Sequence, residues 1–192
     1  VNMTIKYNNV FIEDAYTICG NYENDGPLSK YFDKKYEKDL YFGEKSWEQA
    51  EVHLLKEANT NILKKNKLKE EDIDLLISGD LQNQIAASNY MAREFNIPFL
   101  GIFEACSTSG EGLAIGSTYI EGGFAKRILV STSSHNMAAE KQFRNPTEYG
   151  TPKPKTATFT ATGAVSILLT NKKNKIKIES STIGKVVDMG TT

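Results

Sequence analysis

A short apolar run that turns directly into a glycine-rich helix constrains this chain most: residues 99–123 read FLGIFEACSTSGEGLAIGSTYIEGG. The run from Phe99 to Phe103 predicts a buried strand, and the helix is expected to begin near Ser107. Each glycine lowers helix stability by about 1 kcal/mol relative to alanine, so several of them indicate that other backbone elements must approach closely. The helix is therefore expected to be buried between layers. Its larger side chains, expected to fill the surrounding space, are Leu113, Ile115, Tyr119 and Ile120.

Cys106 lies at the turn between this strand and this helix. At such a turn a sulfur faces unpaired N–H groups and the positive end of the helix dipole, which favour the thiolate over the thiol. The turn therefore predicts either a nucleophile or an anion-binding position. A small buried hydrophobic residue is the alternative interpretation of a cysteine. The strand, the sharp turn and the glycine-rich helix favour the functional interpretation.

Strands and helices alternate along most of the chain. A strand with mixed apolar and polar positions is predicted over 10–19, buried strands over 72–79, 99–103, 126–131 and 163–170, and an edge strand over 175–180. Helices are predicted from Ser46, which forms a capping box with Gln49, and over 84–95. This order predicts an α/β fold with a mostly parallel sheet and helices on both faces. Ligand sites in such sheets lie beyond the carboxyl ends of the strands, here residues 80–84, 104–107 and 133–136.

Two segments and two histidines leave alternatives open. The charged segment 31–42 predicts a solvated surface excursion, and the long segment 138–158 predicts either a functional lid or a solvated loop. His53 lies within the first helix and is expected to be exposed rather than catalytic. His135 follows a strand and is either a hydrogen-bonded structural residue or a binding residue beside Cys106.

Bulk properties exclude several classes of protein. The 192 residues suit one domain or slightly more, and a net charge of −1 argues against general nucleic-acid binding. No apolar run of about 18 residues and no secretory leader is present, so the chain is expected to be intracellular and to reach a membrane only through a partner. Its two cysteines, Cys19 and Cys106, lie far apart and indicate a reducing compartment. No cofactor or metal ion is expected.

Several segments together resemble the thiolase superfamily and, within it, the stage V sporulation protein AD family. The ACST sequence around Cys106 is typical of the superfamily, whereas SSHN followed by EKQFRNPTEYG is typical of the narrower family. The segments that carry the resemblance are 25–34, 73–84, 97–114, 122–136, 139–150 and 182–190.

The resemblance implies binding of dipicolinic acid (pyridine-2,6-dicarboxylate) by a component of the spore inner-membrane channel complex, on its cytoplasmic side. It makes Cys106 the counterpart of the superfamily nucleophile, here vestigial, and makes channel proteins of the same sporulation stage the expected partners. A planar dianion requires N–H groups, basic side chains and an apolar slot. The candidate ligand-binding residues are Cys106, Ser107, His135, Lys141, Arg144 and Asn83. The alternatives are a Cys-dependent acyl-CoA condensing or acyl-transfer enzyme, and a docking scaffold with a vestigial pocket.

The resemblance covers only the first of the two similar halves that superfamily members contain. Residues 1–170 are expected to form the thiolase-like N-terminal half, and residues 171–192 an edge strand and a linker towards an absent second half. Condensing enzymes take their remaining catalytic residues from that second half, so this chain is expected to lack a complete catalytic set. Because the glycine-rich helix would lose a partner surface, homodimer formation or poor stability is expected.

Overall fold

Seven strands form one mixed sheet in the computed structural model, which describes residues 3–143, 156 and 158–190. The strand order is β3-β2-β7-β6-β4-β5, with β8 beside β2. Their bounds are Phe11–Cys19 (β2), Lys34–Lys35 (β3), Leu75–Gly79 (β4), Phe99–Gly101 (β5), Arg127–Ser134 (β6), Gly163–Thr170 (β7) and Ile176–Lys177 (β8). β2, β3, β4, β5 and β6 run in one direction, and β7 runs antiparallel to both of its neighbours. The predicted mostly parallel, mixed sheet is confirmed.

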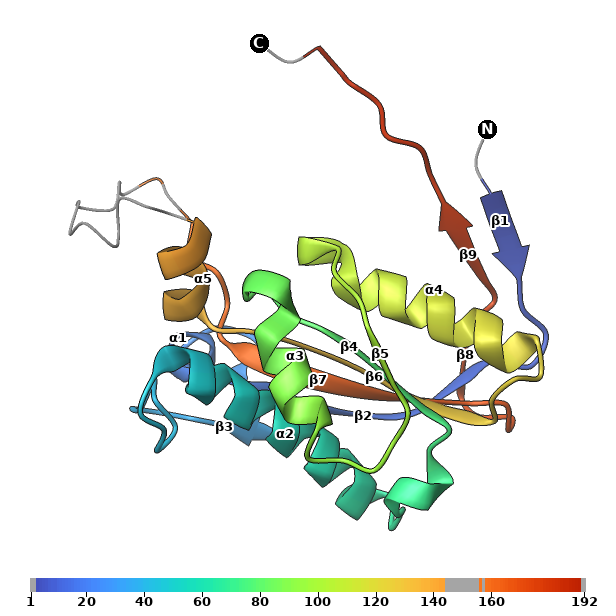
Figure 1. Cartoon of the computed structure of the whole chain (residues 1–192), viewed down its shortest axis with the longest axis horizontal. Helices are drawn as coiled ribbons and strands as arrows, with labels where there is room; N and C mark the ends of the chain where they lie inside the picture. Colours follow the sequence, from blue (N-terminus) through green and yellow to red (C-terminus); the bar gives the residue numbers. More distant parts are fainter. Residues whose placement is uncertain (1–2, 144–155, 157, 191–192) are drawn as a thin grey trace.

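Helices cover both faces of this sheet, as predicted (Figure 1). α2 (Trp47–Lys65) and α3 (Ala86–Ala92) pack on one face, and α4 (Thr108–Glu121) packs on the other. α1 (Asn21–Asn24) and α5 (Asn136–Phe143) lie near the end of the sheet where β2 and β6 finish. Short 3-10 turns complete the chain: Ser29–Tyr31, Glu70–Asp72, Asn83–Ile85 and Ala105–Ser107. The helix predicted over 84–95 is thus shorter at both ends.

Adjacent residues on the central strands supply the two separate hydrophobic cores. On β4, Leu76 packs towards α2 whereas Ile77 packs towards α4, and on β7 Leu168 and Leu169 divide in the same way. Successive side chains on a strand point to opposite faces, so a strand covered on both faces is apolar at consecutive positions. This explains why the apolar runs at β4, β6 and β7 predicted buried strands correctly. The run 99–103 instead forms a short strand at the edge of the sheet, β5, in which Gly101 is exposed.

The segment 31–42 is exposed at most of its charged positions, as predicted, but it is not a detached excursion, because two of its residues pair with β2 and its last residue is buried. β3 pairs with β2, and Phe42 is only 6% exposed within the core beneath α2. The chain then enters α2, where the Ser46 hydroxyl accepts a hydrogen bond from the Gln49 N–H at 3.2 Å, as predicted for the helix start. The segment is therefore anchored at Phe42 while Asp33, Lys35, Lys38 and Asp39 remain exposed.

The glycines of α4 let the helix lie directly on the sheet. A β-carbon on Gly112 would stand 2.6 Å from Cγ1 of Val130, and one on Gly116 would stand 2.9 Å from Cδ1 of Leu169. The predicted close approach is therefore confirmed. The predicted burial between two layers is wrong for the side of α4 that carries Tyr119, which is 39% exposed.

Two further strands join the beginning of the chain to its end. β1 (Met3–Lys6) pairs antiparallel with β9 (Ser180–Ile183), and this ribbon extends beyond α4 (Figure 1). Tyr7 is 2% exposed, and its hydroxyl contacts the Ala114 carbonyl oxygen of α4 and the Ser181 hydroxyl. The sequence did not predict β1, because its partner lies more than 170 residues away.

α5 replaces the first part of the predicted loop 138–158. The loop prediction was wrong up to Phe143, and residues 144–155 and 157 lie outside the described part of the chain. In the part of the chain that is described, no helix combines the length and the apolarity needed to cross a bilayer.

Candidate functional site

A cavity of about 570 Å³ lies where β2, β4 and β6 end and β7 begins. This is the edge at which the sequence placed the site, because the carboxyl ends of these parallel strands meet there. Hydroxyl-bearing residues dominate its polar lining: Thr17, Thr108, Ser109, Thr132, Ser133, Ser134, Thr158, Thr160 and Thr162. Ile18, Phe32, Phe159 and Val165 supply apolar surface. The cavity therefore offers many neutral donors and acceptors around an apolar slot.

Cys106 is exposed and lines this cavity, within the 3-10 turn that leads into α4. The preceding residue, Ala105, has a φ of 46°, a left-handed conformation that L-residues other than glycine rarely adopt. Thr108 stabilises the turn: its hydroxyl donates to the Ala105 carbonyl oxygen at 2.8 Å and accepts from the Glu104 N–H at 3.1 Å. The sulfur is thus presented by a strained backbone turn, a feature common at functional sites.

The charged residues in the described lining are two acids, Glu23 and Asp80, with no lysine or arginine among them. Both carboxylate oxygens of Asp80 accept backbone hydrogen bonds, from Gln82 N–H at 2.8 Å and Ser88 N–H at 2.7 Å. Burial nevertheless raises the pKa of Asp80. Oε1 of Glu23 accepts from the Thr162 N–H at 3.1 Å, and its Oε2 is buried with no hydrogen bond among the described atoms.

Of the predicted ligand-binding residues, Cys106 is the one that the described cavity lining contains. Ser107 lies beside it, and its hydroxyl donates to the Glu104 carbonyl oxygen at 2.9 Å. His135 is fully buried: Nε2 lies 2.7 Å from the Leu40 carbonyl oxygen, and Nδ1 accepts from the Met137 N–H at 3.2 Å. Both ring nitrogens of His135 are therefore engaged within the protein.

Two further predicted residues, Lys141 and Asn83, do not line this cavity. Lys141 forms an ion pair with Glu48 at 2.9 Å on the outer side of α2. Asn83 is exposed, and its N–H donates to Oε1 of Gln142 at 2.6 Å. Arg144 falls outside the described residues. The predicted set is thus not gathered around Cys106 by the described part of the chain.

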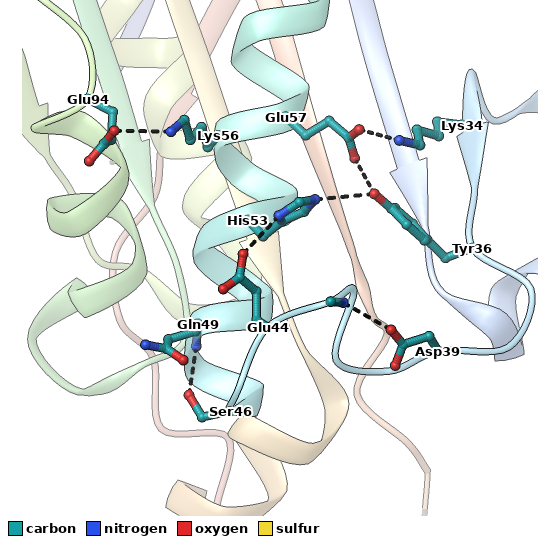
Figure 2. Close-up of polar contacts among 11 residues, drawn as sticks. Lys34, Tyr36, Asp39, Glu44, Ser46, Gln49, His53, Lys56, Glu57 and Glu94 are labelled. Carbon is teal, nitrogen blue, oxygen red and sulfur yellow. Dashed lines mark hydrogen bonds and ion pairs between the residues drawn. The ribbon is translucent and has the colours of Figure 1, made fainter.

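Asn83 lines a second, larger groove of about 970 Å³ between α2 and α3. Figure 2 shows its polar contacts: His53 lies between Glu44, with Nδ1 3.2 Å from Oε1, and the hydroxyl of Tyr36 at 3.3 Å. The acids of this groove are paired, for example Glu94 with Lys56 at 3.0 Å. His53 is thus a partly exposed helix residue that hydrogen-bonds to the segment before α2. Because the acids of this groove are already paired, the cavity beside Cys106 is the stronger candidate site.

Glu51, on α2, is a buried residue near the site that the sequence analysis missed. It is 1% exposed, and burial together with the nearby Asp80 carboxylate raises the pKa of Glu51 to about 8. A signal was present in the sequence, because Glu51 recurs at helical spacing with the apolar residues Leu55, Ala58 and Ile62. A glutamate within an apolar helical stripe indicates a buried polar contact.

Sequence comparison identifies relatives over nearly the whole chain. The sequence profile of the family described as Stage V sporulation protein AD matches residues 2–192. Stage V sporulation protein AD from Bacillus subtilis (strain 168) is 50% identical over 183 residues, which cover 95% of this chain and 54% of that protein. The chain therefore spans about half the length of this curated relative.

Structural comparison shows a thiolase-like fold, which confirms the predicted fold class. OleA from Xanthomonas campestris matches with a TM-score of 0.54 and 15% identity, covering 86% of this chain and 59% of that chain. The 3-oxoacyl-[acyl-carrier-protein] synthase III from Aquifex aeolicus matches with a TM-score of 0.51 and 18% identity, covering 91% and 55%. A fungal type III polyketide synthase matches with a TM-score of 0.56 and 12% identity, covering 85% and 56%.

Proposed function

The chain belongs to the stage V sporulation protein AD family, and on that premise we propose that it binds dipicolinic acid in the cavity beside Cys106. In this proposal it acts on the cytoplasmic side of the spore inner membrane as a component of the channel complex, with other stage V sporulation proteins as partners. The family relationship carries the proposal. The cavity supports it, since about 570 Å³ lies within the range of about 300–1,000 Å³ typical of small-molecule sites.

The lining suits part of such a ligand. A planar pyridine ring would pack against apolar lining residues such as Phe32 and Phe159, and its carboxylates would accept hydrogen bonds from the threonine and serine hydroxyls. A dianion also requires positive charge, which the described lining lacks. We assign that role to Arg144, which the chain carries directly after α5.

Calorimetric titration with dipicolinate tests this proposal. The chain and its B. subtilis relative should both bind, Arg144→Ala should weaken binding by at least tenfold, and Cys106→Ala should change it less. Lys141→Ala serves as the matched control, because Lys141 pairs with Glu48 and does not line the described cavity. Absence of binding by both wild-type proteins would refute the proposal and leave a docking scaffold as the remaining interpretation.

An acyl-transfer enzyme is the second candidate, favoured by the exposed thiol of Cys106 on its strained turn. A nucleophilic cysteine usually needs a base within hydrogen-bonding distance, and the described lining contains no histidine. Incubation with acetyl-CoA followed by intact-mass measurement tests this function. A stable adduct of acetyl mass that disappears in Cys106→Ala would favour the enzyme.

A further inference from the structure

The side chain of Glu51 connects α2 to one residue of the cavity wall, Ser133, and to Gln82, which bonds a second wall residue, Asp80. Its Oε1 accepts a hydrogen bond from the Ser133 hydroxyl at 3.0 Å, and its Oε2 accepts one from Nε2 of Gln82 at 2.9 Å. Ser133 belongs to β6 and lines the cavity. Gln82 follows β4, and its N–H donates to Oδ1 of Asp80, which also lines the cavity. One carboxyl group thus ties together the ends of two neighbouring parallel strands.

The surroundings of Glu51 are unfavourable for a negative charge. Asp80 faces it from the end of β4, and Glu48 lies one turn earlier on α2, where it pairs with Lys141. α5, which packs against α2, contributes Glu140 and Lys141 as its charged residues. The hydrogen-bond partners of Glu51 are neutral groups. An ionised Glu51 would therefore be a buried charge beside other carboxylates, and no cation among the described residues hydrogen-bonds to it.

The neutral acid fits the same contacts without that penalty. A serine hydroxyl can donate or accept, so the contact with Ser133 persists when Glu51 carries a proton, and the Gln82 amide can still donate to the other oxygen. The adjoining buried polar groups are also neutral: Ser78 bridges Ser88 and Ser131, and Ser131 accepts from the Asn59 amide. The protonated form therefore satisfies this region, whereas the ionised form requires water or displacement of the side chain.

We propose that Glu51 is a positioning residue which, as a neutral carboxylic acid, holds two groups in the ligand-binding arrangement: Ser133 in the cavity wall, and Gln82, which bonds the cavity-lining Asp80. Its ionisation releases both. The inference rests on the proposed function, because one of its two tests measures the affinity for dipicolinate. It makes binding at this cavity decrease as the pH rises, although Glu51 itself does not line the cavity. Burial raises the pKa of Glu51 to about 8, which places the change in mildly alkaline solution.

The test compares the wild-type chain with Glu51→Gln, which is permanently neutral and close in shape. Dipicolinate affinity is measured by calorimetry from pH 6 to pH 9, a range over which both ligand carboxylates stay ionised. Wild-type affinity should fall at least fivefold across this range, whereas that of Glu51→Gln should change less than twofold. Glu94→Gln, which removes an exposed carboxylate from the end of α3, should follow the wild-type profile.

Hydrogen exchange without ligand supplies an independent measurement. Protection of the amides at 132–134 should decrease with pH in the wild type after correction for the intrinsic exchange rate, and it should stay constant in Glu51→Gln. Identical pH profiles of protection in the two proteins would overturn the proposal. So would a pH-dependent protection in the wild type that leaves dipicolinate affinity unchanged. If no protein binds dipicolinate, the proposed function fails, and the exchange profiles alone decide whether Glu51 holds Ser133 in place.

Discussion

The backbone of Gly79 packs closely against the side chain of Thr108: a β-carbon on Gly79 would stand 2.5 Å from Cγ2 of Thr108. The same β-carbon would stand 2.3 Å from the carbonyl oxygen of Ile102, which cannot move without displacing β5 and the turn after it. Because Thr108 also holds the Ala105 carbonyl oxygen, the end of β4 supports the turn that presents Cys106. The position of the sulfur therefore depends on a glycine in a different strand.

Gly79→Ala should destabilise the protein, because the added methyl group must displace backbone rather than a flexible side chain. We expect a loss of about 1–3 kcal/mol, as for other overpacked core positions, or more. Gly110→Ala is the matched control: no atom lies within 4 Å of its added methyl group, so it should stabilise α4 by up to about 1 kcal/mol. Urea unfolding of both variants checks this, and equal effects would contradict it.

Ala105→Gly should relieve strain at the turn before Cys106. A left-handed conformation is unfavourable by about 1–2 kcal/mol for an L-residue, and glycine avoids most of this at a smaller entropic cost in the unfolded chain. The variant should be as stable as the wild type or up to about 1 kcal/mol more stable. Ala114→Gly, inside α4, should instead lose about 1 kcal/mol. Thermal unfolding of the two variants distinguishes them, and a clear loss in Ala105→Gly would show that the turn is unstrained.

Glu23→Gln should strengthen dicarboxylate binding, since it removes a like charge from the cavity wall. The amide oxygen can still accept the hydrogen bond from the Thr162 N–H that Oε1 of Glu23 now receives. We expect affinity to increase by about tenfold, equivalent to about 1.4 kcal/mol. Calorimetry with dipicolinate measures the change. Weaker binding would mean that Glu23 contacts the ligand favourably, for example through a shared proton.

Sequence reasoning recovered the elements whose signal is local. The apolar runs on either side of Cys106, the Ser46 cap and the glycines of α4 each predict structure from neighbouring residues, and the structure contains these features. β1 was missed because its pairing with β9 joins the two ends of the chain. The burial of Phe42 was not predicted because its core partners come from distant elements, while the segment around it carries many charged residues.

The predicted edge of the sheet holds the cavity, and of the predicted ligand-binding residues Cys106 is the one in its described lining. Strand order alone located the edge of the sheet that holds the cavity, since the carboxyl ends of parallel strands coincide. Which side chains point into the cavity depends on packing, which places His135 against Leu40 and Lys141 against Glu48. Residue type suggested basic ligand-binding groups, whereas the described lining carries acids and hydroxyls.

His135 should make the protein less stable in mild acid. Burial lowers the pKa of His135 although the Leu40 carbonyl oxygen opposes this effect, so the unfolded chain takes up a proton at higher pH than the folded protein does. Its contribution to stability is therefore complete above about pH 6.5 and is lost as the pH falls towards the lowered value. In His135→Asn the amide oxygen should still accept hydrogen bonds from the N–H groups at the start of α5, but the side chain no longer titrates. Urea midpoints from pH 5 to pH 8 should show the stability of the two proteins converging as the pH falls. A constant difference would contradict this account.

The exposed aromatic pair at the end of α4 should promote association between copies of the chain. Phe124 is 81% exposed and Tyr119 is 39% exposed, and their rings contact each other with centroids 6.4 Å apart. Removing such apolar surface from water contributes about 25 cal/mol per Å², so covering it by a second copy is favourable.

Sedimentation velocity should show concentration-dependent dimers for the wild type and at least tenfold weaker association for Phe124→Ser. Tyr90→Ser, at a similarly exposed aromatic on α3, is the control and should associate like the wild type. If Tyr90→Ser weakens association and Phe124→Ser does not, the dimer forms through the α3 side of the sheet, and the open face of α4 is not its interface.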